Sequence, residues 1–168
     1  KTKSKTALWL EGGITETIEA EASMVAQSIN ASLYDYKKYN GDKKPSLELL
    51  TFLTSDKSAT SAADAGLVYG AAVGDGMNTA KQLGNLPANI CTPSYLADQA
   101  VALGKKKLNK ASITTEILNR SQMQKLKMDS LLSVAEGSEE PPKLIVMKYQ
   151  GTDVSKKPVV LVGKAVTF

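Results

Sequence analysis

One lysine near the end of the chain stands where a parallel sheet would place a ligand site. The apolar run from Val159 to Val162 is typical of a strand buried on both faces of a largely parallel sheet, and Gly163 and Lys164 follow it directly. In an open α/β sheet the ligand crevice lies outside the carboxyl ends of the strands. The sequence therefore predicts that Lys164 lies at a functional site.

The absence of histidine and the presence of a single cysteine exclude several kinds of catalytic and metal site. The chain has no histidine, so a Ser-His-Asp triad, a Cys-His pair and an imidazole metal site are excluded within it. Cys91 is the single cysteine, which excludes an internal disulfide and agrees with a reducing compartment.

The charge pattern leaves a nucleic-acid interaction as a minor alternative. The net charge is +4 with a pI near 9.0, and lysines gather in short runs such as Lys105 to Lys107. A nucleic-acid surface would interleave arginines and aromatics with them, but Arg120 is the single arginine and aromatics make up 5%. Solvated loops and helix ends explain the lysines better.

Size and hydropathy are those of an ordinary soluble protein. The 168 residues are 42% hydrophobic and 23% charged, enough for one sizeable core or two small ones. No apolar run approaches the roughly 20 residues that cross a bilayer, and the N-terminus lacks the pattern of a signal peptide. We expect a cytoplasmic protein without a membrane partner. The final apolar run has no capping helix after it, which suggests a piece of a larger protein.

The first third of the chain follows a strand, helix, strand order. Residues 6–10 and 47–54 are predicted strands, and residues 16–34 between them are a predicted amphipathic helix with Thr15 as its cap. This order favours two parallel neighbouring strands joined by a right-handed crossover. The layer is too small for a complete domain, so we expect exposed sheet edges and apolar faces that promote aggregation.

A long stretch of small residues follows, from residue 58 to residue 86. We interpret it as a connecting helix, because small side chains let another backbone approach closely and compensate for the helix cost of Gly70, Gly74 and Gly76. The alternative is a phosphate loop over residues 70–76. It is disfavoured because no strand leads into it and no Gly-Lys-Ser/Thr pattern is present.

The second half continues with alternating elements. Thr92 is predicted to cap a helix that begins at Pro93 and runs to the lysines at 105–107. A strand over 113–118 follows, then a short helix capped by Ser121, and then a strand over 142–149.

Several of these segments resemble one known family, the leucyl (cytosol) aminopeptidases. The pattern Asn85-x-Pro87-x-Asn89, with Thr92-Pro93-Ser-Tyr-Leu-Ala opening a helix, is similar to the start of that family's catalytic domain. The segment ending in Gly137-Ser138, the strand after it and the run from Pro158 to Phe168 resemble later family segments in the same order. The similarity is good from about residue 72 onward and weak over the first 55 residues.

The resemblance implies a two-domain metallo-exopeptidase that releases N-terminal residues, leucine-type, from peptides, usually as a homohexamer. It implies two divalent metal ions, Mn or Zn, and it assigns Lys164 as a metal ligand, bound as the neutral amine. The family's aspartate ligand would come directly after Phe168, so we expect this stretch alone to be inactive. The chain's own acids match no family ligand and are interpreted as exposed loop carboxylates: Asp129, Glu136, Glu139, Glu140 and Asp153.

The predicted architecture is α/β throughout. Residues 1–57 are interpreted as the remainder of an N-terminal α/β, macro-like domain, residues 58–86 as a connecting helix, and residues 87–168 as the first layers of a catalytic α/β domain. Two other functions stay open: a non-catalytic α/β binding module, and a basic nucleic-acid-binding accessory surface, whose affinity would fall steeply with salt.

Overall fold

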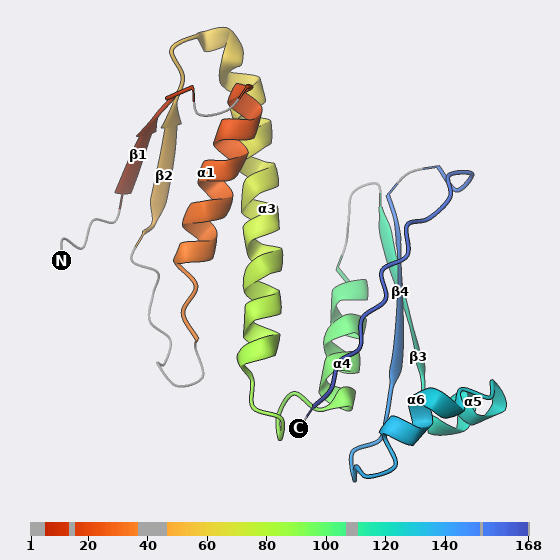
Figure 1. Cartoon of the computed structure of the whole chain (residues 1–168). Coiled ribbons are helices and arrows are strands. Elements are labelled where there is room, and N and C mark those ends of the chain that lie inside the picture. Colours follow the sequence, from red (N-terminus) through yellow and green to blue (C-terminus); the bar gives the residue numbers. More distant parts are fainter. Residues whose placement is uncertain (1–5, 14–15, 37–46, 107–110, 152, 168) are drawn as a thin grey trace. The chain divides into compact units, whose positions relative to one another are not determined.

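The computed structural model describes residues 6–13, 16–36, 47–106, 111–151 and 153–167 of the chain (Figure 1). Its contacts divide into two compact units, residues 1–85 and residues 86–168. Each unit combines helices with a two-stranded sheet, so the predicted α/β class is confirmed. None of the helices in the described ranges combines the length and the hydropathy that a bilayer crossing requires.

The sheet of the first unit is parallel, as predicted. Strand β1 (Thr6–Leu10) pairs with β2 (Leu49–Leu53), and the register sets Thr6 beside Leu49 and Leu10 beside Leu53. Side chains alternate between the two faces of a strand. Leucines at alternate positions stay exposed on one face of this sheet, with Leu10 67% exposed: Leu8, Leu10, Leu49 and Leu53.

Helix α1 (Ile18–Ser32) begins later than the sequence pattern predicts. Its cap is Thr17, whose hydroxyl accepts a hydrogen bond from the N–H of Ala20 at 3.2 Å. The predicted cap Thr15 lies outside the described residues. The predicted apolar face is confirmed, since Ala22, Val25 and Ala26 are buried.

A buried carboxylate joins β1 to α1. Glu21 is 1% exposed, and its Oε1 accepts hydrogen bonds from the indole N–H of Trp9 at 3.1 Å and from the backbone N–H of Gly12 at 2.8 Å. A buried carboxylate needs such donors, because burial without them is costly. Glu21 therefore fixes the chain where it leaves the first strand, in addition to lying in the first helical turn.

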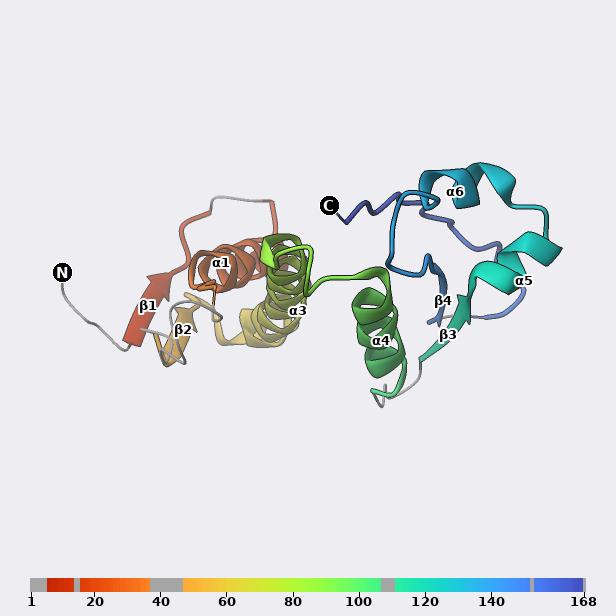
Figure 2. The same ribbon diagram turned by 90° about the horizontal axis from the view of Figure 1, so that it is seen from below.

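The small-residue stretch forms one helix, α3 (Thr60–Asn85), after a short 3-10 turn η1 (Lys57–Ala59). Both views show α3 beside α1 (Figures 1 and 2). Gly66, Gly70 and Gly74 are buried on the side that meets α1. A Cβ on Gly66 would meet the carbonyl of Glu19, and a Cβ on Gly70 would lie 2.8 Å from Cα of Ser23.

These contacts explain why α3 tolerates so many glycines. The missing side chains let the backbones of α1 and α3 touch, and this packing compensates for the low helix propensity of glycine. The expected close approach is therefore confirmed, with α1 as the partner. The alternative of a phosphate loop over residues 70–76 is wrong, since these residues are continuous helix.

The second unit starts with a turn and a capped helix. The carbonyl of Pro87 accepts hydrogen bonds from the N–H groups of Ile90 and Cys91 at 2.9 and 3.0 Å. Thr92 then caps α4 (Pro93–Gly104), with its hydroxyl 3.2 Å from the N–H of Tyr95. Both the cap and the first-turn proline agree with the prediction.

The second unit also contains an antiparallel strand pair. Strand β3 (Ser112–Leu118) pairs with β4 (Leu144–Gln150), with Ser112 opposite Gln150. Between them lie α5 (Arg120–Lys125) and α6 (Asp129–Val134). The buried apolar side chains described in this unit come from α4, α5 and α6 and from the loop before β4: Ala97, Ala100, Met123, Leu132 and Pro142.

Two predictions for this unit are wrong. The cap of α5 is Asn119, not Ser121: its side chain accepts from the N–H of Gln122, and the Gln122 side chain accepts from the N–H of Asn119. This reciprocal pair satisfies more end groups than a serine two residues later could.

The predicted buried strand over residues 159–162 is also not observed. This segment has no regular structure, and Leu161 and Val162 are 92% and 93% exposed. A strand forms only where a neighbouring backbone supplies hydrogen bonds, and within the described residues β3 and β4 pair only with each other. The pair that β3 and β4 form is antiparallel.

Candidate functional site

The predicted site residue Lys164 lies in the irregular segment that follows β4. A turn precedes this segment, with the N–H of Lys156 donating to the carbonyl of Asp153 at 3.2 Å. From Lys156 to Val166 every residue is exposed, and Lys164 stands among them with Gly163 and Ala165 beside it. The structure thus places the Lys164 ammonium on the surface of its unit.

The five acidic residues that match no ligand of the family are exposed, as predicted: Asp129, Glu136, Glu139, Glu140 and Asp153. The carboxylate of Glu136 pairs with the guanidinium of Arg120 at 2.7 Å, and Asp153 accepts the N–H of Ser155 at 2.9 Å. The hydrogen bonds from the backbone and hydroxyl of Ser155 lower the pKa of the Asp153 carboxyl. Asp129 begins helix α6 and does not lie in a loop.

The residues present do not fit a pair of divalent ions. In the part of the chain that the structure describes, no group of three or more Asp, Glu, Cys or His side chains lies close enough to hold a metal. A dinuclear site needs several carboxylates to bridge and bind its ions. Lys164 by itself does not make such a site.

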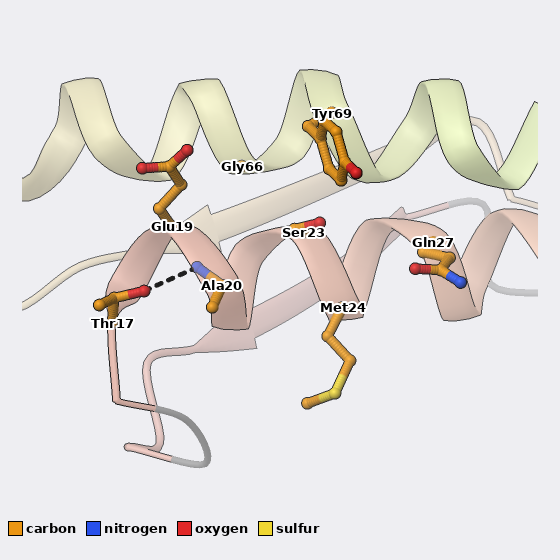
Figure 3. A pocket seen from close by; sticks show the side chains of 8 residues that line it. All are labelled: Thr17, Glu19, Ala20, Ser23, Met24, Gln27, Gly66 and Tyr69. Atoms are coloured by element: carbon orange, nitrogen blue, oxygen red, sulfur yellow. Dashed lines mark hydrogen bonds between the residues drawn. The ribbon is translucent and has the colours of Figure 1, made fainter. Parts of the chain in front are cut away.

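A shallow hollow of about 330 Å³ lies between α1 and α3 (Figure 3). Gly66 lies at its base, where the backbone of Glu19 leaves no room for a side chain. Tyr69 stands on α3, Glu19 and Met24 stand on α1, and Thr17 is the cap of α1 (Figure 3). Sequence analysis missed this hollow, although the glycine spacing was its signal. Its lining offers no catalytic constellation: Thr17, Glu19, Ala20, Ser23, Met24, Gln27, Gly66 and Tyr69.

Comparison with known proteins shows what kind of chain this is. Residues 78–168 match the model of the cytosol aminopeptidase family, catalytic domain. The probable cytosol aminopeptidase of Dechloromonas aromatica (strain RCB) is 43% identical over 148 residues, which cover 88% of this chain and 29% of that protein. The probable cytosol aminopeptidase of Aromatoleum aromaticum (strain DSM 19018 / LMG 30748 / EbN1) is 54% identical over 112 residues, covering 67% of this chain and 22% of that protein.

A solved structure agrees at the level of the fold. The chain is similar to "Bottromycin maturation enzyme BotP in complex with Mn", with a TM-score of 0.68 at 22% identity. The match covers 86% of this chain and 29% of that one. The chain thus spans about a third or less of the proteins it matches. Because the catalytic-domain model matches more than half of the chain and includes Lys164, the chain belongs to the cytosol aminopeptidase family.

Proposed function

We propose that this chain is part of a metal-dependent aminopeptidase that releases N-terminal amino acids, leucine-type, from peptides. The observation that carries the proposal is the catalytic-domain match over residues 78–168, supported by relatives named probable cytosol aminopeptidase. The whole protein acts on peptides in the cytoplasm and assembles as a homohexamer in this proposal.

Two divalent ions, Mn or Zn, serve the reaction in the same proposal, and Lys164 is one of their ligands. The similar solved structure is of an enzyme in complex with Mn, which supports a divalent ion. An ammonium has no free lone pair, so Lys164 binds the metal as the neutral amine. The exposed position of Lys164 leaves its amine open to a metal and to further ligands. The carboxylate ligands then come from parts of the longer protein other than the described residues.

The test substitutes Lys164 in the full-length protein. Lys164→Met removes the amine while keeping a similar side-chain length, and Lys157→Met removes a nearby exposed lysine as the matched control. We expect Lys164→Met to lower leucyl-amide hydrolysis at least about 100-fold and to lower bound metal, measured by elemental analysis. The control should keep both.

The intact mass of the purified protein is measured first, because it tells whether chain beyond these 168 residues is present. A larger protein with metal-dependent activity that Lys164→Met leaves unchanged would contradict the assignment of Lys164. A larger protein without any aminopeptidase activity, in either Mn or Zn, would contradict the proposed function.

A further inference from the structure

The C-terminal end of α1 receives hydrogen bonds from another helix. The last carbonyls of a helix lack partners within it and carry partial negative charge, which a basic residue often offsets. The last turn of α1 has no basic residue of its own. Instead, the ammonium of Lys81 on α3 donates to the carbonyl of Ala31 at 2.8 Å, and the side-chain amide of Asn78 donates to the carbonyl of Asn30 at 3.0 Å.

Two side chains near the C-terminal end of α1 make further hydrogen bonds to α3. The first is that of Asn30. The Asn30 amide donates to Asp75 Oδ1 at 2.8 Å and to the carbonyl of Ala71 at 3.1 Å, and its Oδ1 accepts from Asn78 at 2.8 Å. Asn30 is thereby held from three positions that lie on successive turns of α3. Asn30 therefore continues the contact that the glycines of α3 begin.

Tyr34, just beyond the end of α1, makes the second extension. Its hydroxyl donates to Gln82 Oε1 at 3.2 Å and accepts from the Asn85 amide at 3.0 Å. The Lys81 ammonium lies 5.4 Å from the centre of the Tyr34 ring. We call this set of residues the polar lock: Asn30, Ala31 and Tyr34 with Asn78, Lys81, Gln82 and Asn85.

The position of the polar lock bears on the boundary of the catalytic part. The family's catalytic-domain model begins at residue 78, inside α3, and the α3 members of the lock all lie within its first eight residues, 78–85. Yet residues 78–85 belong to the first compact unit. We infer that the start of the catalytic region folds as part of the N-terminal unit, and that the end of α1 is the surface to which it is anchored.

Physical reasoning explains why such an anchor is needed. The last two turns of a helix fray unless tertiary contacts hold them, since their own hydrogen bonds are few and reversible. The glycine contact with α1 ends at Gly74. Beyond it, the polar lock holds α3 against α1, and its ion-to-carbonyl bond from Lys81 is of the stronger, charge-assisted kind.

Hydrogen exchange on the full-length protein tests the anchor. Lys81→Met removes the donor to Ala31, and Asn78→Asp keeps the side-chain shape but removes both donated bonds. Lys57→Met, in η1 just before the opposite end of α3, is the control that removes a lysine outside the polar lock. We expect amide exchange over residues 82–85 to rise about tenfold in both lock variants, with residues 66–74 little changed.

Hydrogen exchange is measured without any enzyme assay. The inference about the anchor and the proposed activity can therefore be contradicted independently of each other. The inference is overturned if residues 82–85 already exchange freely in the unchanged chain, or if both variants leave their exchange as it was. It is also overturned if the variants raise exchange equally over all of α3. The polar lock would then contribute to the stability of the whole unit and not hold the end of α3 in particular. A rise confined to residues 82–85 supports it.

Discussion

Glu21 holds the connection between β1 and α1. Its carboxylate accepts hydrogen bonds from Trp9 and Gly12 in a buried position. Glu21→Ala leaves both donors without this acceptor, so we expect the free energy of unfolding to fall by about 2–3 kcal/mol. Glu21→Gln keeps an acceptor oxygen, and we expect a loss of about 1 kcal/mol.

Urea unfolding followed by tryptophan emission measures both changes. Trp9 is the single tryptophan of the chain and is itself one of the donors, so its emission reports on this contact directly. Equal losses for the Gln and Ala variants would show that the negative charge, not the acceptor oxygen, is what the site requires.

Hydroxyl hydrogen bonds set the acidity of Asp56. The Ser58 hydroxyl, at 2.6 Å from Oδ2, is the largest cause that lowers the Asp56 pKa below its ordinary value of 3.8, followed by the Ser58 N–H at 2.8 Å from Oδ1. Because the folded-state pKa is depressed, ionised Asp56 stabilises the fold above the unfolded pKa. That contribution is lost as the pH falls below about 3.8 and through the folded pKa.

Removal of the Ser58 hydroxyl should therefore raise the pKa of Asp56 part of the way back to its ordinary value. We expect Ser58→Ala to show it in an NMR titration of the Asp56 carboxyl carbon. Ser155→Ala is the comparison, because the backbone N–H of Ser155 is the larger cause of the lowered Asp153 pKa. A larger rise at Asp153 than at Asp56 would contradict this order of causes.

The contact between α1 and α3 requires glycine at particular positions of α3. A Cβ at Gly70 would meet the backbone of Ser23, which cannot move without displacing α1. We expect Gly70→Ala to lower the free energy of unfolding by about 2–3 kcal/mol. Gly76→Ala is the matched control on the same helix: nothing lies within 4 Å of its added Cβ, so it should stabilise by about 1 kcal/mol.

Thermal or urea unfolding of the two variants gives the comparison. If Gly70→Ala proves as harmless as Gly76→Ala, the helices are not in backbone contact, and the glycines of α3 need another explanation.

The elements also show what a sequence can and cannot predict. Helix caps next to a proline, such as Thr92, and the parallel pairing of β1 with β2 follow from local patterns and are found in the structure. The run from Val159 to Val162 has the same local pattern as a buried strand, but the pattern names no partner strand. The cap at Asn119 is harder to predict, because its capping role depends on Gln122 as well.

The candidate site was predictable to a similar extent. Lys164 is selected by its place after an apolar run and by the resemblance, and membership of the family is confirmed. Its role as a ligand stays a prediction, because the groups that would complete a metal site are not among the described residues. Glu21 carries no separate signal, since a glutamate in a first helical turn is ordinarily exposed.

At the scale of the whole molecule, the two compact units should respond separately to core substitutions. Met123 on α5 is fully buried in the second unit. We expect Met123→Ala to destabilise that unit by about 2–4 kcal/mol, seen as faster amide exchange in β3, while the urea midpoint of Trp9 emission stays unchanged. A parallel shift of the Trp9 midpoint would show that the two units unfold as one.

The pairing of α1 with α3 has a consequence for synthesis on the ribosome. The hydrogen bonds between them join residues that are 41 to 50 positions apart in the chain. At roughly 5–20 residues per second, α1 is made roughly 2–10 seconds before its partner residues on α3. During that interval Ala22, which is buried next to Gly66 in the folded chain, has no α3 to cover it. A nascent chain paused between residues 36 and 66 is therefore the form most exposed to chaperones and proteases.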